Sequence, residues 1–368
     1  PANERSILGF SYNTLQFPQL MMGYNYDDGF MIGAGISRRT YGFLNLPYAT
    51  DQQFSAIYAV ERKALQLRYR GEFNQIGKKT DLLIRAGLNT PNITNFTGFG
   101  NNTMVPDGKN FDFYRIRYRT VEAELLLRRR PFESLHLMAG PYFYQYSNNY
   151  SDNNKTILAE PRQVGLDSAD IFGKKSYAGL KLAMQFDNRN NLLFPTRGLL
   201  WTNEIIATAG LGDKADNYTR FSSDMTIYVS QRDPARAVLV LGFGGSKVFS
   251  DDYEFFQAAN IGNNNINIHG FRKYRFLGKS SIYASAEARI KLFNINGYLL
   301  PGQFGITGFY DAGRVWYAGE SSKRWHGAYG GGLYFIPFNR FIISAAAGFS
   351  ENERMLNFSL GTKMNISF

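Results

Sequence analysis

The sequence predicts an all-β fold, namely one transmembrane antiparallel barrel of sixteen strands. Apolar and polar residues alternate with a period of two in segment after segment, whereas helical periodicity is hard to find. These segments run to about ten residues or longer, while strands of soluble proteins average about five or six. A tilted strand needs about nine to eleven residues to cross a bilayer. The strands of a soluble β-sandwich also alternate apolar and polar residues. The strand length and the lack of a helical layer to cover the strands therefore favour the membrane barrel over the sandwich.

Residues 281–292 show which face each side chain should take. One face carries apolar residues such as Ile282 and Ile290, and the opposite face carries Glu287 and Arg289. In lipid only a closed barrel satisfies every backbone hydrogen bond of the strands. The apolar face is therefore expected to meet lipid and the polar face to line the lumen.

The alternating runs, taken in order, form one barrel domain over 18–368 behind a short periplasmic segment, 1–17. Longer polar connections (89–110, 147–175, 209–218, 248–280, 317–324) alternate with shorter ones, as extracellular loops and periplasmic turns do. An even strand count puts both termini on the periplasmic side. The predicted strands are 18–26, 29–40, 53–62, 64–73, 80–88, 111–130, 134–146, 176–187, 198–208, 219–230, 236–247, 281–292, 303–316, 325–336, 339–349 and 356–368.

Composition excludes several function classes. The net charge of +11 is spread through the strands and does not cluster on one helical face, so no nucleic-acid partner is expected. Cysteine is absent and only three histidines occur, so neither a metal site nor another cofactor is predicted. No Gly-x-Ser-x-Gly, His-Glu-x-x-His or phosphate-binding loop is present, and no catalytic residue is assigned. The chain is predicted not to be an enzyme.

Four motifs resemble the BamA-type superfamily of outer-membrane assembly factors and transporters, the bacterial surface-antigen family. The stretch "HGFRKYRFLGKSSIYASAEARIKLF" resembles that family's sixth extracellular loop and the following strand. "GFYDAGRVW" is similar to its next strand motif, "FDNRNNLLFPTRGLLW" to a periplasmic turn, and "PQLMMGYNYDDGFMIGAG" to its opening hairpin. The motifs occur in family order, so the resemblance covers the chain from about residue 18.

The resemblance marks candidate site residues in one loop and one strand. The loop motif is His269, Gly270, Phe271 and Arg272, where His269 holds the position of the family's arginine. The strand motif contributes Phe309, Asp311 and Gly313, and a C-terminal assembly signal would comprise Phe358, Ile366 and Phe368.

Side-chain parity places Asp311 and Glu287 in the lumen, where a carboxylate needs water or a partner. We therefore expect the basic loop 248–280 to fold into the lumen, with Arg272 or His269 against Asp311 or Glu287. Gly270, which has no Cβ, would let the backbone turn tightly beside the wall.

The function that the resemblance implies is insertion of proteins into, or transport across, the bacterial outer membrane. A barrel that anchors or exports an attached soluble domain, and a passive porin, are the alternatives. The expected partners are outer-membrane lipids and lipopolysaccharide, client outer-membrane proteins, and periplasmic or lipoprotein accessory subunits.

Overall fold

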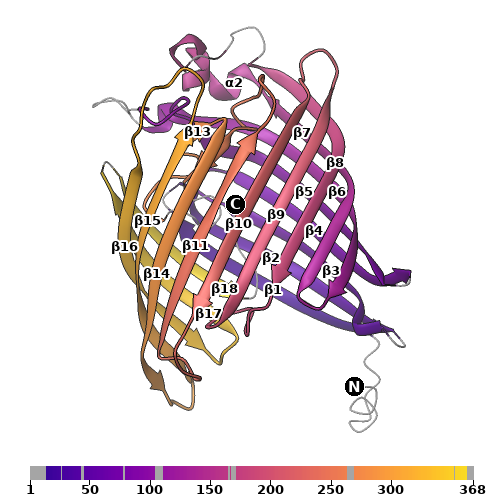
Figure 1. The fold of residues 1–368 in the computed structure, drawn as a ribbon, viewed down its shortest axis with the longest axis vertical. Coiled ribbons are helices and arrows are strands. Elements are labelled where there is room, and N and C mark those ends of the chain that lie inside the picture. The colour runs from indigo at the N-terminus through magenta and orange to yellow at the C-terminus, as the bar shows by residue number, and fades with distance from the viewer. Residues whose placement is uncertain are drawn as a thin grey trace.

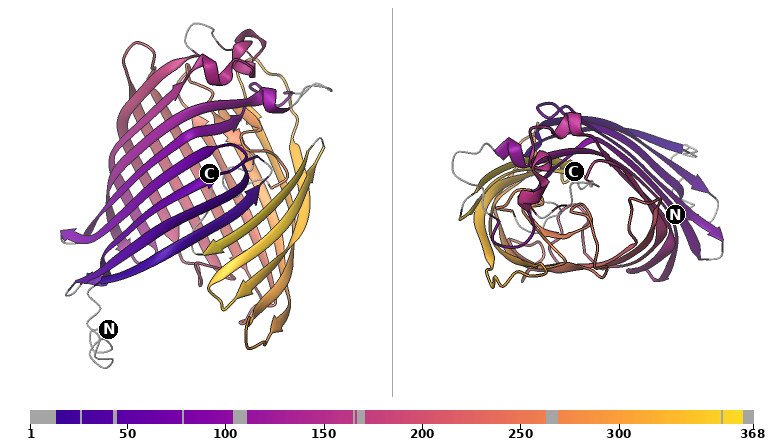
Figure 2. Two further views of the ribbon diagram at one scale, coloured as in Figure 1. Left: turned by 180° about the vertical axis from the view of Figure 1, so that it is seen from behind. Right: turned by 90° about the horizontal axis from the view of Figure 1, so that it is seen from above.

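The computed structural model describes residues 14–25, 27–42, 45–77, 79–103, 111–164, 166, 171–262, 269–351 and 353–362. Sixteen antiparallel strands close into a barrel in which each strand pairs with its neighbours along the chain, and the first pairs with the last (Figure 1). Seen from one end, the strands form a ring (Figure 2, right). The predicted fold class and strand number are confirmed.

The barrel strands follow the alternating runs of the sequence closely. They are β1 (Thr14–Asn25), β2 (Gly29–Gly42), β3 (Asn45–Ala59), β4 (Ala64–Gly77), β5 (Thr80–Asn95), β6 (Arg115–Phe132), β7 (Leu135–Asn148), β8 (Gly173–Asp187), β9 (Gly198–Leu211), β10 (Tyr218–Val229), β11 (Ala237–Val248), β14 (Ser280–Ile295), β15 (Gly302–Trp316), β16 (His326–Pro337), β17 (Phe341–Ser350) and β18 (Arg354–Thr362).

Two strands extend well beyond their predicted limits. β3 begins eight residues earlier than predicted, in the mixed stretch "NLPYATDQ", where Asp51 accepts hydrogen bonds from Arg39 of β2. β5 continues to Asn95 past Pro91, where the β5–β6 ladder shifts register between Asn89 and Asn92. A bulge accommodates a proline that would interrupt a regular ladder. Each extension contains a proline and lacks sustained apolar alternation, so periodicity does not predict it as strand.

The alternation sorts side chains between two faces as expected. Large apolar side chains are exposed on the outer face, for example Leu20 at 66% and Leu180 at 61%. On the inner face Lys181 Nζ lies 2.8 Å from Glu124 Oε2 and 2.8 Å from Glu204 Oε2. The barrel therefore has an apolar outer surface and an ion-paired interior.

The longer connections build a compact layer near the end that is uppermost in Figure 1. They contain η1 (Phe111–Tyr114), α2 (Tyr150–Asn153), η2 (Ile157–Ala159), η3 (Pro161–Val164), β12 (Ala259–Ile261) and β13 (Phe276–Gly278). β12 and β13 form a separate two-stranded sheet within the segment predicted as one loop, 248–280. Aromatic and aliphatic side chains from these connections and from the adjoining strand ends pack into one cluster, including Phe96, Tyr146, Leu158, Phe255 and Leu277. None of the helices in the described part of the chain has the length and apolar character needed to cross a membrane.

The seam between β1 and β18 is paired over a short length. Four residue pairs, from Met22–Leu360 to Asn25–Asn357, form this ladder, whereas β1 and β2 pair over all twelve residues of β1. Among the described residues the ladder stops there, although β18 continues beside β17 to Thr362. Figure 2 (left) shows the indigo and yellow strands that meet at this seam. Residues 363–368, which complete the predicted last strand, lie outside the described residues.

Candidate functional site: the basic segment and the barrel wall

Asp311 is a carboxylate buried inside the barrel wall. It lies on β15 next to Tyr310, which points outward and is 59% exposed, whereas Asp311 itself is 0% exposed. Its Oδ1 accepts a hydrogen bond of 2.5 Å from Ser285 Oγ on the neighbouring strand β14. A buried carboxylate is stable only when its oxygens are bonded.

His269 supplies the other bonds to Asp311. Its backbone N–H donates to Asp311 Oδ2 at 2.7 Å, and its Nδ1 lies 3.0 Å from the same oxygen. Burial lowers the pKa of His269, but the hydrogen bond and the charge of Asp311 outweigh it and raise the pKa overall. Asp311 thus stabilises the imidazolium form of His269 relative to an imidazole in water. The ring also packs on Phe309, with 4.5 Å between ring centroids.

Gly270 brings the backbone of the basic segment, residues 269–275, against the barrel wall. A Cβ at this position would lie 2.5 Å from Cβ of Ala328 and 3.1 Å from the carbonyl oxygen of Phe349. A Cβ on Gly348 of β17 would in turn lie 2.9 Å from Cα of Gly270. Two glycines thus allow direct contact between backbones, which no larger residue permits.

Substitution of Gly270 by alanine should weaken this contact. We expect Gly270→Ala to lower the free energy of unfolding by about 1–3 kcal/mol, since overpacking forces the backbones apart. Gly87→Ala on β5 is the matched control, because a Cβ there meets nothing within 4 Å. Thermal unfolding of both variants in detergent micelles measures the difference. Equal stability of the two variants would contradict the close contact.

The next residues continue the contact with the wall. Phe271 is 5% exposed and packs on Phe276, with ring centroids 5.5 Å apart. Phe276 stacks on His326 of β16 at 3.6 Å between centroids. Gly313 of the strand motif lies opposite Tyr283 of β14 and His326 of β16.

Glu287 and Arg272 form other bonds than the predicted ones. Glu287 accepts hydrogen bonds from Arg289 (3.0 and 2.8 Å) and Thr307 (2.6 Å). Arg272 donates from Nη1 to Asp27 Oδ1 at 3.1 Å and from its backbone N–H to Glu353 Oε2 at 2.9 Å. It therefore meets neither Asp311 nor Glu287 in these bonds.

Of the proposed C-terminal signal, only Phe358 is described. It lies on the outer face of β18, is 44% exposed and sits opposite Tyr24 across the seam. Ile366 and Phe368 lie outside the described residues.

Three partners escaped the sequence analysis: Ser285, Asp27 and Glu353. Ser285 shares the inner parity of Glu287 on the same strand, and that parity could have indicated it. Asp27 lies in the acidic "YDDG" between β1 and β2, and Glu353 in the acidic "ENE" before β18. These two acidic turns, beside the first and last strands, could have indicated that the basic loop binds there.

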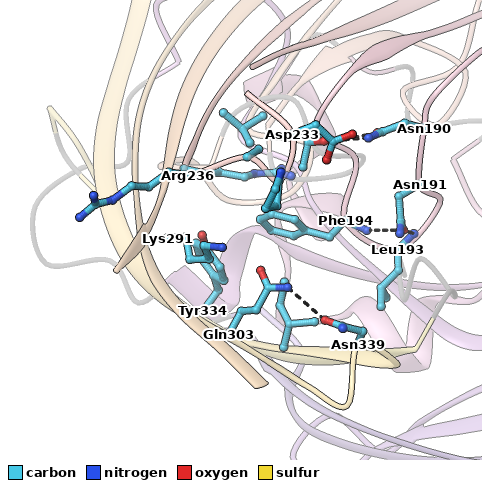
Figure 3. Close-up of a pocket in the computed structure, with 16 residues that line it drawn as sticks. Asn190, Asn191, Leu193, Phe194, Asp233, Arg236, Lys291, Gln303, Tyr334 and Asn339 are labelled. Carbon is cyan, nitrogen blue, oxygen red and sulfur yellow. Dashed lines mark hydrogen bonds between the residues drawn. The ribbon is translucent and has the colours of Figure 1, made fainter. Parts of the chain in front are cut away.

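The opposite end of the barrel holds a cavity, shown in Figure 3. The β8–β9 turn reaches across to other strands here, with Phe194 5.1 Å from Tyr334 of β16 between ring centroids. The Cζ atom of Arg289 lies 5.3 Å from the centroid of the Phe194 ring. The cavity has a volume of about 290 Å³, and Arg236, Lys291 and Gln303 are among the residues that line it. The turn thus narrows this mouth of the barrel.

Removal of the Phe194 ring should widen this mouth. We expect Phe194→Ala to raise single-channel conductance in planar bilayers, because pore-lining bulk limits ion passage. Leu192→Ala is the control, since Leu192 lies on the same turn and is 58% exposed. Unchanged conductance in Phe194→Ala would show that the narrowest point lies elsewhere.

Comparison with known proteins identifies the family of this fold. The family model described as "Omp85 superfamily domain" matches residues 31–364. No curated protein sequence is significantly similar to the chain.

Several solved structures share the fold. A BamA from Haemophilus ducreyi lacking POTRA domains 1–3 superposes with a TM-score of 0.65 at 13% identity, over 94% of this chain and 70% of that one. CdiB from Escherichia coli gives 0.62 at 12% identity, over 96% and 63%. CdiB from Acinetobacter baumannii gives 0.57 at 14% identity, over 95% and 60%. The chain thus spans less than two thirds of the CdiB structures, and at these identities the likeness shows the fold alone.

The family match, the closed barrel of sixteen strands and these structural neighbours agree with one another. Barrels of this superfamily insert or transport proteins in the bacterial outer membrane, together with client proteins and accessory subunits. The chain belongs to the Omp85 superfamily and is an outer-membrane β-barrel of that family.

Proposed function

We propose that this barrel inserts client β-barrel proteins into the outer membrane, using the seam between β1 and β18 as the place where client strands add. The observation that carries the proposal is the short ladder at this seam, which comprises four residue pairs among the described residues. An unpaired strand edge presents N–H and C=O groups that can template a new strand. A short ladder leaves fewer hydrogen bonds to break, so this seam would open more readily than the fully paired strands beside it.

The basic segment, residues 269–275, would act as a plug fixed inside the barrel. Its support comes from the bonds of His269 to Asp311, the backbone contact at Gly270 and the buried ring of Phe271. A fixed segment of this kind would hold the shape of the wall while the seam opens. It would also reduce free passage of solutes, which disfavours a passive porin.

The proposed orientation puts both termini in the periplasm. With sixteen strands, the start of β1 and the end of β18 lie at the same end of the barrel, and the longer connections lie at the other end. In outer-membrane barrels the longer connections face the exterior. The outer face, with Leu20 and Leu180 exposed, would then contact lipid and lipopolysaccharide.

Assembly of a client in defined liposomes tests the proposal. The probe is a urea-unfolded outer-membrane barrel of eight strands, diluted into liposomes that contain this chain. Its folding is followed by the shift of the folded form in unheated gels. We expect faster folding than in liposomes that contain an equal amount of an unrelated sixteen-stranded porin. Equal rates would refute the insertase role, and a large steady conductance would then favour a porin.

A further inference from the structure

Two acidic turns flank the paired end of the seam. Asp27 lies in the turn between β1 and β2, just after Asn25, the last residue of β1 that pairs across the seam. Glu353 lies directly before β18. The four residue pairs of the seam, Tyr24–Phe358 among them, lie next to these turns. One turn therefore belongs to each side of the seam, although the two carboxylates are far apart in sequence.

Arg272 bonds to both sides. Its Nη1 lies 3.1 Å from Asp27 Oδ1, on the β1 side of the seam. Its backbone N–H donates to Glu353 Oε2 at 2.9 Å, and its Nε lies 3.9 Å from Glu353 Oε1, on the β18 side. The guanidinium also covers the ring of Phe111, with 3.9 Å from Cζ to the centroid. A single residue thus links the two strands whose edges meet at the seam.

Neighbouring basic residues extend the link on each side. The backbone N–H of Lys273 donates to Asp27 Oδ2 at 2.9 Å, and its ammonium group pairs with Asp28. Arg275 Nε donates to Glu353 Oε1 at 3.1 Å, while its Nη1 bonds Thr97 Oγ1 at 3.0 Å. Both sides of the seam are therefore tied to one short stretch of chain.

These groups are removed from water. Asp27 and Arg275 are each 5% exposed and Arg272 is 9% exposed. Screening by salt is weak for buried pairs, and removal of one partner leaves the other charge uncompensated. The set of contacts is therefore expected to resist separation of the two turns.

We propose that Arg272, with Lys273 and Arg275, forms an ionic clasp across the seam, and that the clasp makes the seam open from its other end. The clasp holds the end at Tyr24 and Phe358 closed. The stretch of β1 from Thr14 to Met21, which lies beyond the described ladder, is then the part that separates. A role of the clasp in client entry rests on the proposed function, whereas the existence of the clasp does not.

Distances between spin labels can report seam opening without touching β1 or β18. Phe30 on β2 lies opposite Tyr24, and Ala345 on β17 lies opposite Phe358, so labels at Phe30→Cys and Ala345→Cys bracket the clasped end. Ala34→Cys, opposite Leu20, and Phe341→Cys, opposite Thr362, bracket the second positions beyond the described ladder in the same way. The chain has no native cysteine to interfere.

The chain is studied in lipid nanodiscs by pulsed electron paramagnetic resonance. The otherwise unchanged barrel should give a narrow distribution for the pair at the clasped end and a broader one for the second pair. Glu353→Gln should increase the population with long distances at the clasped end by about tenfold, as expected when charge-assisted hydrogen bonds are weakened. Asp27→Asn, on the other side of the seam, should do the same.

Glu351→Gln is the matched control for Glu353→Gln. Glu351 lies two residues away in the same connection, is paired with Arg324 and is exposed to solvent, so the same charge is removed without loosening the clasp. Equal broadening in Glu351→Gln and Glu353→Gln would overturn the clasp, and so would no broadening in any folded clasp variant. Should neither clasp variant fold, equal widths for the two label pairs in the unchanged barrel would still refute it.

This measurement needs no client, which separates it from the proposed function. Broadening at the clasped end together with no effect on client folding would leave the clasp in place and reject the insertase. Client folding by the unchanged barrel, with no broadening in Glu353→Gln, would reject the clasp alone.

Discussion

A disulfide bond across the seam is expected to abolish client assembly by this barrel. Gly23 and Ser359 lie directly opposite each other, and a Cβ on Gly23 would meet no atom closer than 3.4 Å. Directly opposed residues of antiparallel strands have Cα atoms about 4.5–5.5 Å apart, within the range that a disulfide spans. Gly23→Cys with Ser359→Cys should therefore lock β1 to β18, and reductant should restore the rate of client folding.

The locked barrel needs a control in which the wall is cross-linked elsewhere. Ser246 on β11 and Ser281 on β14 also lie directly opposite each other, far from the seam along the sheet. Cysteines at these two positions should form a disulfide bond and leave client folding unchanged under oxidising conditions. Full activity of the seam cross-link, with the bond verified by mass spectrometry, would reject strand addition at the seam.

Loss of the Asp311 carboxylate is expected to release the basic segment. Asp311→Ala leaves the backbone N–H of His269 and the hydroxyl of Ser285 without their acceptor, inside the barrel. Breaking a buried charged pair by removing one partner costs about 3–5 kcal/mol. We therefore expect lower resistance to heat unfolding and faster cleavage by trypsin after Arg272 and Lys273, which are buried in the intact barrel.

Glu287→Ala separates release of the segment from a general loss of stability. Glu287 is the next inner residue after Ser285 on β14, and it bonds Arg289 and Thr307 instead of the segment. This variant should also lower stability, but cleavage after Arg272 should stay slow when measured well below its unfolding midpoint. Equal cleavage rates in the two variants would show that Asp311 does not anchor the segment.

Much of the barrel could be predicted from local pattern. In β14 the alternation of Ile282 and Ile290 with Glu287 and Arg289 specified the strand and its two faces. The same parity on β15 placed Asp311 inside, where it is fully buried. Local pattern was insufficient at the ends, where β3 and β5 extend through stretches that contain a proline and show no sustained apolar alternation.

The partners inside the barrel could not be predicted in this way. Parity tells which face a side chain takes but not its height along the barrel, which depends on the register of every strand between two positions. Thus the sequence left open whether His269 or Arg272 meets Asp311. In the structure His269 lies at Asp311, while Arg272 lies near Asp27, which is 245 residues away in sequence.

The amino-acid sequence by itself determined the sixteen strands, the face of each and the resemblance to an outer-membrane family, because these depend on period-two alternation and short motifs. Only the tertiary structure decided the length of the seam ladder and the groups that gather beside it. Closure of the barrel brings β1 next to β18 and sets Asp27, Arg272 and Glu353 within bonding distance. Such contacts arise from closing the sheet on itself, and no local pattern records them.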